Sequence, residues 1–288
     1  MKYYGKVFRP PSEARSLIVQ ATVGCSYNKC DFCSMYKDDT FHLRDLEELK
    51  VEVKEYLEER PFYKRVFIAD GDALCLSNDK LIDLCDFFAK NMENLERITA
   101  YATAKDILRK SDEELRELRD HGIEMVYVGY ESGSDEILKD VNKNSTAEEY
   151  IMATKKAKAA GIKVSATIIA GLGGMDKMEL NAVETAKVVT GAKPNYISYL
   201  TLDLFPDTPL YERYKSGEFK RLSPLDILQE IKIFLEHVDS EGTVFRSNHA
   251  SNYISLAGNL NEDIERMIEE IDEALREENY KPEYLRGF

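Results

Sequence analysis

The chain has 288 residues, of which 43% are hydrophobic and 32% are charged. This composition predicts either one large α/β domain or two small ones with a substantial core, and it excludes a disordered chain. The formal charge of −14 argues against broad binding to nucleic acid, because such binding depends on Lys and Arg side chains that neutralise phosphates. We therefore expect a small-molecule substrate.

The sequence contains no run of about 18 apolar residues, which a membrane-spanning helix would need. Its first residues, Met-Lys-Tyr-Tyr-Gly, lack the apolar stretch of a signal peptide. We therefore expect a cytoplasmic protein without a membrane span.

Short apolar runs alternate with longer amphipathic stretches along the first 202 residues. The apolar runs predict six strands, at Leu17–Thr22, Val66–Ala69, Ile98–Ala102, Met125–Tyr130, Val164–Ala170 and Tyr196–Leu202. The stretches between them predict helices at Leu46–Glu59, Asp79–Asn94, Asp112–His121, Ala147–Ala160 and Leu180–Thr190. This alternation is typical of a parallel sheet with helices outside it.

Six strand–helix units predict an α/β fold of the partial (β/α)6 TIM-like barrel type. Residues 1–202 would form this barrel core. Residues 203–288, with a helix at Pro224–His237, a short segment at Thr243–Tyr253 and a final charged helix, would form an extension that covers the barrel mouth and contributes to the substrate pocket. In such a barrel the chemistry lies at the carboxyl ends of the strands, so the residues after each strand are the functional candidates.

Three of the five cysteines, Cys25, Cys30 and Cys33, lie within nine residues on the loop after the first predicted strand. Three thiolates can hold a four-iron cluster and leave one iron open for chemistry. Structural zinc is the alternative, but it usually takes four protein ligands. Cys75 lies elsewhere, and Cys85 is expected on an apolar helix face as a small buried hydrophobe. Three unrelated core cysteines are the remaining alternative.

The segment Cys25-Ser26-Tyr27-Asn28-Lys29-Cys30-Asp31-Phe32-Cys33 resembles the cluster motif of the radical S-adenosylmethionine (SAM) superfamily, in its coproporphyrinogen-oxidase-like and elongator-protein-like compact branch. The resemblance extends from about Ser16 to Leu202. The common spacing is Cys-x3-Cys-x2-Cys, whereas here the first gap has four residues. The resemblance implies a [4Fe-4S] cluster on Cys25, Cys30 and Cys33, with Phe32 at the usual aromatic position and SAM on the open iron.

Later strand ends resemble the superfamily's SAM contacts. Asp70-Gly71-Asp72 stands where the amino group of SAM is received, although an ordinary Asp-Gly turn is the alternative. Gly129-Tyr130-Glu131-Ser132-Gly133-Ser134 implies a ribose contact for Glu131, while Ser132 and Ser134 could instead cap a helix. The run from Ile168 to Gly174 resembles a motif near adenine. The other candidates at strand ends are Thr103, Lys105, Thr201 and Asp203.

The substrate contacts are expected in a polar segment, with the alternative that it is an Asn-rich sheet edge. Its candidate residues are Arg246, Asn248, His249 and Asn252, to which we add Asp203 and, after the cluster loop, Tyr36, His42 and Arg44. These groups would suit a polar heterocycle or polyol such as a modified nucleobase. The compact branch includes queuine lyases, and this resemblance suggests queuine as the substrate.

The resemblance implies radical chemistry. An electron donor such as flavodoxin or ferredoxin reduces the cluster, SAM is cleaved, and a 5′-deoxyadenosyl radical abstracts hydrogen from the substrate. The sequence shows no second cysteine cluster and no added basic domain, which argues against methylthiolation and whole-tRNA modification. Two alternatives stay open: another radical reaction, such as decarboxylation or dehydrogenation in tetrapyrrole or cofactor metabolism, and a non-catalytic iron-sulfur or haem-handling protein that binds SAM.

Overall fold

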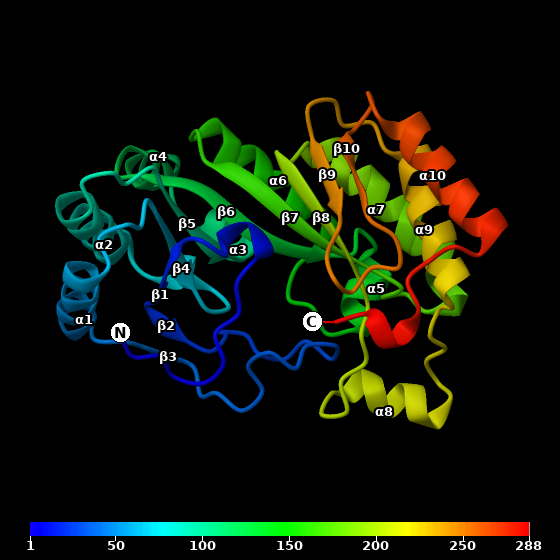
Figure 1. Cartoon of the computed structure of the whole chain (residues 1–288), viewed down its shortest axis with the longest axis horizontal. Coiled ribbons are helices and arrows are strands. Elements are labelled where there is room, and N and C mark those ends of the chain that lie inside the picture. The colour runs from blue at the N-terminus through cyan, green and yellow to red at the C-terminus, as the bar shows by residue number, and fades with distance from the viewer. Residues whose placement is uncertain (288) are drawn as a thin grey trace. The chain divides into compact units, whose positions relative to one another are not determined.

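The computed structural model describes residues 1–287, which form two compact units (Figure 1). The first unit comprises residues 1–28, 35–128 and 156–164, and the second comprises residues 29–34, 129–155 and, of the described residues, 165–287. The chain passes between them on either side of residues 29–34 and within β6, α6 and β7. Within residues 1–287, none of the helices combines the length and hydropathy needed to cross a bilayer.

The first unit contains a parallel sheet in the order β1, β4, β5, β6. These strands are β1 (Leu17–Gln20), β4 (Arg65–Ala69), β5 (Arg97–Ala102) and β6 (Ile123–Glu131), and a small antiparallel pair is formed by β2 (Thr22–Val23) and β3 (His42–Leu43). The unit's helices are α1 (Leu46–Glu59), α2 (Asn78–Asn91), α3 (Ala104–Arg109) and α4 (Asp112–Asp120), with short 3-10 turns at Pro11–Glu13 and Ala73–Cys75.

The second unit continues with β7 (Lys163–Ala170), β8 (Tyr196–Thr201), β9 (Val244–Ser247) and β10 (Leu256–Asn259). β7, β8 and β9 are parallel, and β10 runs antiparallel to β9. Its helices are α5 (Asp135–Asp140), most of α6 (Ala147–Ala159), α7 (Met178–Ala192), α8 (Pro209–Ser216), α9 (Pro224–His237) and α10 (Ile264–Glu277), with 3-10 turns at Met175–Lys177 and Glu283–Leu285.

All six predicted strands are present, and their observed limits differ from the predicted ones by at most two residues. One prediction needs correction: Leu17–Thr22 is not continuous, since β1 ends at Gln20 and Thr22 belongs to β2. The reason is pairing, because residues 17–20 pair with β4 whereas Thr22 pairs with Leu43.

Local sequence fixes several helix starts. Asp45 caps α1 by accepting hydrogen bonds from the amides of Glu47 and Glu48. Ser111 with Glu114 and Ser223 with Asp226 form capping boxes at the starts of α4 and α9. Cys85 lies on the inner face of α2 and is fully buried, as the sequence predicts.

Candidate functional site

The cysteine-rich loop follows β2. Cys25 belongs to the first unit, and Cys30 and Cys33 belong to the second. All three are partly exposed, and no disulfide forms among residues 1–287. Over the same residues, no three Cys, His, Asp or Glu side chains are grouped as a preformed metal site.

The turn after β4 lies directly against Cys25. A Cβ added to Gly71 would stand 2.6 Å from the Cys25 Cβ and 3.1 Å from its Sγ, so only glycine fits this backbone position. The Gly71 amide donates to the carbonyl of Gly24 at 3.1 Å. The Asp70-Gly71-Asp72 turn and the first cysteine are therefore packed as one local structure.

Two carboxyl groups of this turn are buried and incompletely paired. Asp70 accepts hydrogen bonds at Oδ2 from the Gln20 amide group (2.7 Å) and the Gly24 backbone (2.9 Å), while Oδ1 has no partner. Asp72 accepts from Ser26 at Oδ2, and its Oδ1 also lacks a partner. Burial raises the pKa of Asp70 to about 6, and burial followed by the neighbouring Asp106 raises that of Asp72 to about 8.

These observations fit the cofactors that the sequence implies. The unpaired oxygens of Asp70 and Asp72 are acceptors of the kind that the ammonium group of SAM needs. The three thiols supply the donor type that an iron-sulfur cluster requires.

In the second unit, Cys30 lies within the electrostatic environment of Lys143 and Tyr150. The Lys143 ammonium is 3.0 Å from Oε1 of Glu131, and both side chains are mostly buried. Burial lowers the pKa of Lys143, but Glu131, Tyr150 and Cys30 together outweigh this and hold it above its usual value. Sequence reasoning missed Lys143, because it lies in a loop outside any motif and reaches Glu131 only through the fold.

Glu131 has a left-handed backbone conformation with φ +65°, a strained geometry for a residue with a side chain. Its side chain folds back over Gly129, where an added Cβ would lie 2.1 Å from the Glu131 Oε1. The strand end thus presents a carboxylate that is fixed by Lys143 and by its own backbone.

Ser132 and Ser134 make structural hydrogen bonds. The Ser134 hydroxyl accepts from the Ile137 amide and caps α5, and the Ser132 hydroxyl accepts from the Ser134 amide at 3.1 Å. Phe32 packs against an apolar cluster that contains Val141, Leu202 and Leu210, and Ile168 is fully buried in β7.

The remaining candidates in the first unit lie in local structural contacts. Thr103 caps α3 through the Asp106 amide, and Lys105 is exposed on that helix. Tyr36 is buried with its ring edge on Phe8 at 5.5 Å between centroids. Arg44 is buried and pairs with Glu52 at 2.8 Å, whereas His42 is exposed.

In the polar segment of the second unit, Arg246 and Asn248 are exposed and His249 is partly buried, with Nδ1 2.9 Å from the Ser251 hydroxyl. Burial, and then Lys281, lowers the pKa of His249. Asn252 is buried and fully engaged, since it accepts from Thr201 Oγ1 at 2.9 Å and donates to the Tyr199 carbonyl at 2.7 Å. The structure thus brings Thr201 and Asn252 together and leaves Arg246 and Asn248 open to solvent.

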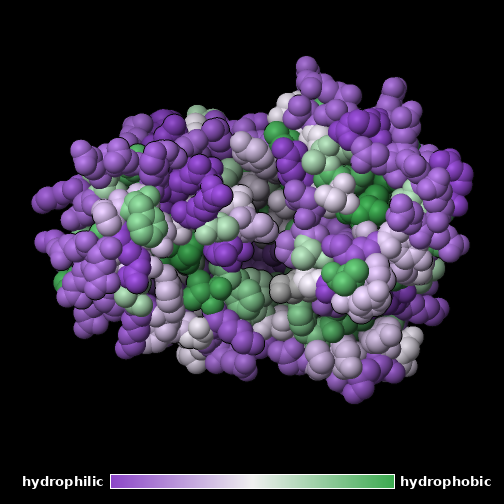
Figure 2. All heavy atoms as spheres, in the orientation of Figure 1, coloured by the Kyte–Doolittle hydropathy of each residue, from purple (hydrophilic) through white to green (hydrophobic). Residues whose placement is uncertain are grey.

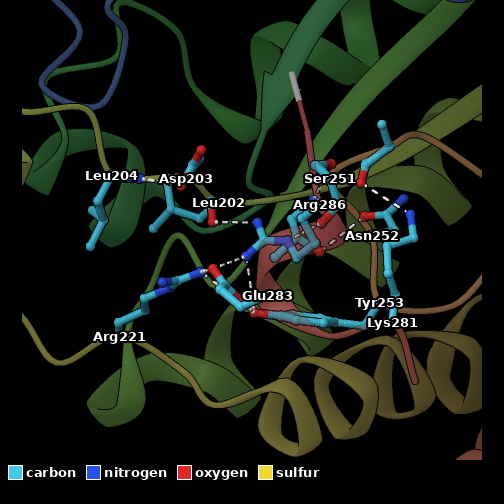
Figure 3. Close-up of polar contacts among 12 residues, drawn as sticks. Leu202, Asp203, Leu204, Arg221, Ser251, Asn252, Tyr253, Lys281, Glu283 and Arg286 are labelled. Atoms are coloured by element: carbon cyan, nitrogen blue, oxygen red, sulfur yellow. Dashed lines mark hydrogen bonds and ion pairs between the residues drawn. The ribbon is translucent and has the colours of Figure 1, made fainter. Parts of the chain in front are cut away.

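A polar cluster that the sequence did not predict lies beside the end of β8 (Figure 3). Arg286 donates to the Ser251 carbonyl (2.6 Å), the Tyr253 hydroxyl (3.0 Å) and Glu283 (2.7 Å). Glu283 also accepts from Arg221 and Tyr253 at 2.6 and 2.7 Å. Burial opposes the ionised form, but these hydrogen bonds lower the pKa of Glu283 to about 2. Asp203 accepts from the Leu204 amide and contributes to the raised pKa of Arg221.

The chain is similar in sequence to curated proteins of known organisms. The chain is 32% identical over 163 residues to a protein of Methanocaldococcus jannaschii whose name assigns it provisionally to the methylthiotransferases; the match covers 54% of this chain and 35% of that one. The chain therefore spans about a third of this relative's length.

Two solved structures share the fold. Methylornithine synthase has a TM-score of 0.55 at 16% identity, covering 93% of this chain and 82% of its own. Coproporphyrinogen III oxidase from Escherichia coli has a TM-score of 0.56 at 18% identity, covering 77% and 54%. The α/β, partial TIM-like barrel fold is thereby confirmed. Because the profile of the radical SAM superfamily matches residues 19–186, the chain belongs to this superfamily, whose members use a [4Fe-4S] cluster and SAM.

Proposed function

We propose that Cys25, Cys30 and Cys33 hold the [4Fe-4S] cluster of a radical SAM enzyme that acts on a small polar substrate. The observation that carries the proposal is the three-thiol loop, with Gly71 packed against Cys25 and two unpaired carboxyl oxygens on the same turn. Bound there, the cluster and SAM would supply one-electron chemistry, by which a hydrogen atom would be removed from the substrate. The protein's residues then have to position the cofactor and exclude competing hydrogen donors.

In this proposal, residues at different strand ends position different parts of SAM. Asp70 and Asp72 accept hydrogen bonds from the amino group of SAM, and Glu131, held by Lys143, accepts them from the ribose hydroxyls. The backbone from Ile168 to Gly174 flanks adenine. Phe32, Thr103, Lys105 and Thr201 are the further cofactor candidates at these positions.

For the substrate we propose queuine, from which a lyase reaction would release a deazaguanine precursor. The net charge of −14 favours a small neutral or cationic molecule over a polyphosphate, and a polar heterocycle needs donors and acceptors in fixed directions. Arg246, Asn248, His249 and Asp203 have polar groups that can supply them. All four lie in the extension of residues 203–288, which in this proposal contributes to the substrate pocket. Asn252 would act indirectly, since its amide is engaged by Thr201 and Tyr199.

The test is a product assay under anaerobic conditions. The protein is reconstituted with iron and sulfide and reduced with dithionite or a flavodoxin or ferredoxin system, and 5′-deoxyadenosine is measured with SAM, with and without queuine. We expect queuine to raise the rate and to yield a smaller deazapurine. Cys30→Ala should abolish the product, whereas Cys85→Ala, which alters a buried cysteine of α2, should retain it.

The other outcomes identify the alternatives. A 5′-deoxyadenosine rate that queuine does not change would keep the radical chemistry and reject this substrate, in favour of another radical reaction such as decarboxylation or dehydrogenation. An intact cluster that yields no product with any reductant would favour a SAM-binding protein without catalysis. The name of the M. jannaschii relative makes methylthiolation a further reaction to assay, although this sequence has no second cysteine cluster.

A further inference from the structure

Glu230 is a buried carboxylic acid in the middle of α9. Its side chain is 0% exposed, and no Lys, Arg or His within residues 1–287 forms an ion pair with it. Its Oε1 accepts two hydrogen bonds, from the Gly171 amide at 3.0 Å and from the Asn181 side-chain amide at 2.9 Å. A buried acidic group in an apolar helix face is costly unless it is hydrogen-bonded or neutral.

The Glu230 carboxyl group is suited to a neutral structural role. Burial raises its pKa to about 8, even though both hydrogen bonds lower it. At neutral pH the protonated form therefore predominates, and Oε1 can act as an acceptor without the cost of a buried charge.

The first of its contacts fixes the loop after β7. Gly171 has φ +84°, and an added Cβ would stand 2.9 Å from Cδ1 of Ile227, which is also on α9. Helix α9 therefore contacts Gly171 in two ways. Glu230 accepts a hydrogen bond from the Gly171 amide, and Ile227 packs closely against the Gly171 Cα. A side chain at Gly171 would be strained by its φ of +84° and would require the Ile227 side chain to move.

The second contact continues through α7 to the loop after β6. Asn181 accepts at Oδ1 from the Ser132 hydroxyl at 2.6 Å, and Ser132 in turn accepts from the Ser134 amide. The Gly133 amide donates to Thr185 Oγ1 at 2.8 Å, also on α7. Helices α7 and α9 pack side by side (Figure 1). The hydrogen bond between Asn181 on α7 and Glu230 on α9 lies between them.

We propose that Glu230 is a positioning residue that fixes the Gly171–Gly174 loop directly, and the Glu131–Ser134 loop through Asn181, in the conformation that receives SAM. The inference rests on the proposed cofactor roles of Glu131 and of the Ile168–Gly174 backbone. It gives a residue of the C-terminal extension a defined role in the cofactor site.

The test compares three substitutions on the same helix in the reconstituted protein. Glu230→Gln keeps the acceptor oxygen and the size of the side chain, Glu230→Ala removes the acceptor, and Glu236→Ala changes an exposed glutamate as the control. Hydrogen exchange is measured for peptides that cover residues 129–134 and 169–174, and SAM affinity is measured by equilibrium binding. If Glu230→Ala does not fold, Asn181→Ala replaces it, and this variant should loosen residues 129–134 while Gly171 stays protected.

We expect Glu230→Ala to speed exchange in both loops and to weaken SAM binding about tenfold, because two buried donors lose their acceptor. Glu230→Gln should restore slow exchange and affinity to those of the wild type. The inference is overturned if exchange in both loops is unchanged in Glu230→Ala, or if Glu230→Gln is as damaging as the alanine variant. If the wild type binds no SAM but Glu230→Ala still speeds exchange in both loops, the positioning role is supported and the proposed function is rejected. The two failures are therefore distinguishable.

Discussion

Gly71 packs directly against Cys25. An added methyl group would lie 2.6 Å from the Cys25 Cβ, so Gly71→Ala must displace either the turn after β4 or the cysteine loop. We expect this variant to fold and to bind several-fold less iron per chain after reconstitution than the wild type. Gly287→Ala, where an added Cβ meets nothing within 4 Å, is the matched control. Equal iron content in the two variants would contradict the expectation.

The ion pair between Lys143 and Glu131 leads to a second prediction at the residue scale, and its test does not require bound cofactor. Both side chains are more than four-fifths buried, so removing one partner leaves a poorly solvated charge. We expect Lys143→Met to lower the free energy of unfolding by about 2–4 kcal/mol, and the double variant with Glu131→Gln to recover part of that loss. Thermal or urea unfolding of the two single variants and the double variant measures the coupling.

The control for this cycle is Lys139→Met, which changes an exposed lysine of α5. Strict additivity of the two single substitutions would show that the pair is not energetically coupled. In that case Glu131 would owe its orientation to its own backbone conformation alone.

At the level of elements, the strands and helices that have a clear local pattern in the sequence were mostly predicted. The apolar runs located six strands, and the amphipathic stretches between and after them located the long helices, because each signal is contained within one short stretch of sequence. Helices α3 and α5, with six residues each, were missed, since they are too short to show a helical period. β10 was missed because it is recognisable only by its antiparallel pairing with β9.

The same distinction applies to the site. The cysteine spacing and the Asp70-Gly71-Asp72 turn are visible as motifs, and the structure adds the packing of Gly71 on Cys25. Lys143 and Glu230 belong to no motif, and their roles depend on contacts with residues 12 and 59 positions away in the chain. Tertiary contacts of this range cannot be derived from one sequence.

The contact between α9 and the loop after β7 predicts a pH dependence of stability. Glu230 has an ordinary pKa of 4.5 and a folded pKa of about 8, so the folded state binds its proton more tightly than the unfolded state. Its contribution is complete below about pH 4.5 and is lost as pH rises towards 8, by up to about 1.4 kcal/mol per pH unit. Tyr199, which also lies near Glu230, stays protonated throughout this range.

Glu230→Gln cannot titrate and isolates this effect from the other buried carboxyl groups. We expect the Tm of Glu230→Gln minus that of the wild type to increase steadily between pH 5 and pH 8. A difference that is constant over this range would mean that Glu230 is ionised in the folded protein at neutral pH.

At the scale of the whole molecule, the charge of −14 bears on the physical form of the substrate. The face seen in Figure 2 is largely hydrophilic, and the chain has 53 acidic against 39 basic residues. Repulsion of a phosphate backbone should make an intact tRNA a poorer substrate than the released base. We expect product formation from queuine to exceed that from queuosine-containing tRNA and to change little with salt. Faster turnover of the tRNA at low salt would contradict this.

The C-terminal segment connects parts of the second unit that are far apart in sequence. The Arg286 guanidinium contacts the Ser251 carbonyl, the Tyr253 hydroxyl and Glu283, lies over the Tyr253 ring at 4.6 Å, and reaches the Leu202 carbonyl 84 residues away (Figure 3). Its side chain is only 4% exposed, so Arg286→Ala removes both packing and several buried hydrogen bonds. This contact holds the end of β8 and the segment after β9 in place.

We expect Arg286→Ala to destabilise the protein by about 2–4 kcal/mol, with Arg276→Ala, an exposed arginine on α10, near zero. Arg286→Lys should recover only part of the loss, because one ammonium cannot reproduce the spread of the guanidinium donors. Limited proteolysis gives the local readout: cleavage should become faster near residues 250–253 and 279–287 in Arg286→Ala. A variant as stable as Arg276→Ala, with unchanged cleavage, would mean that these segments are held by their apolar packing and not by Arg286.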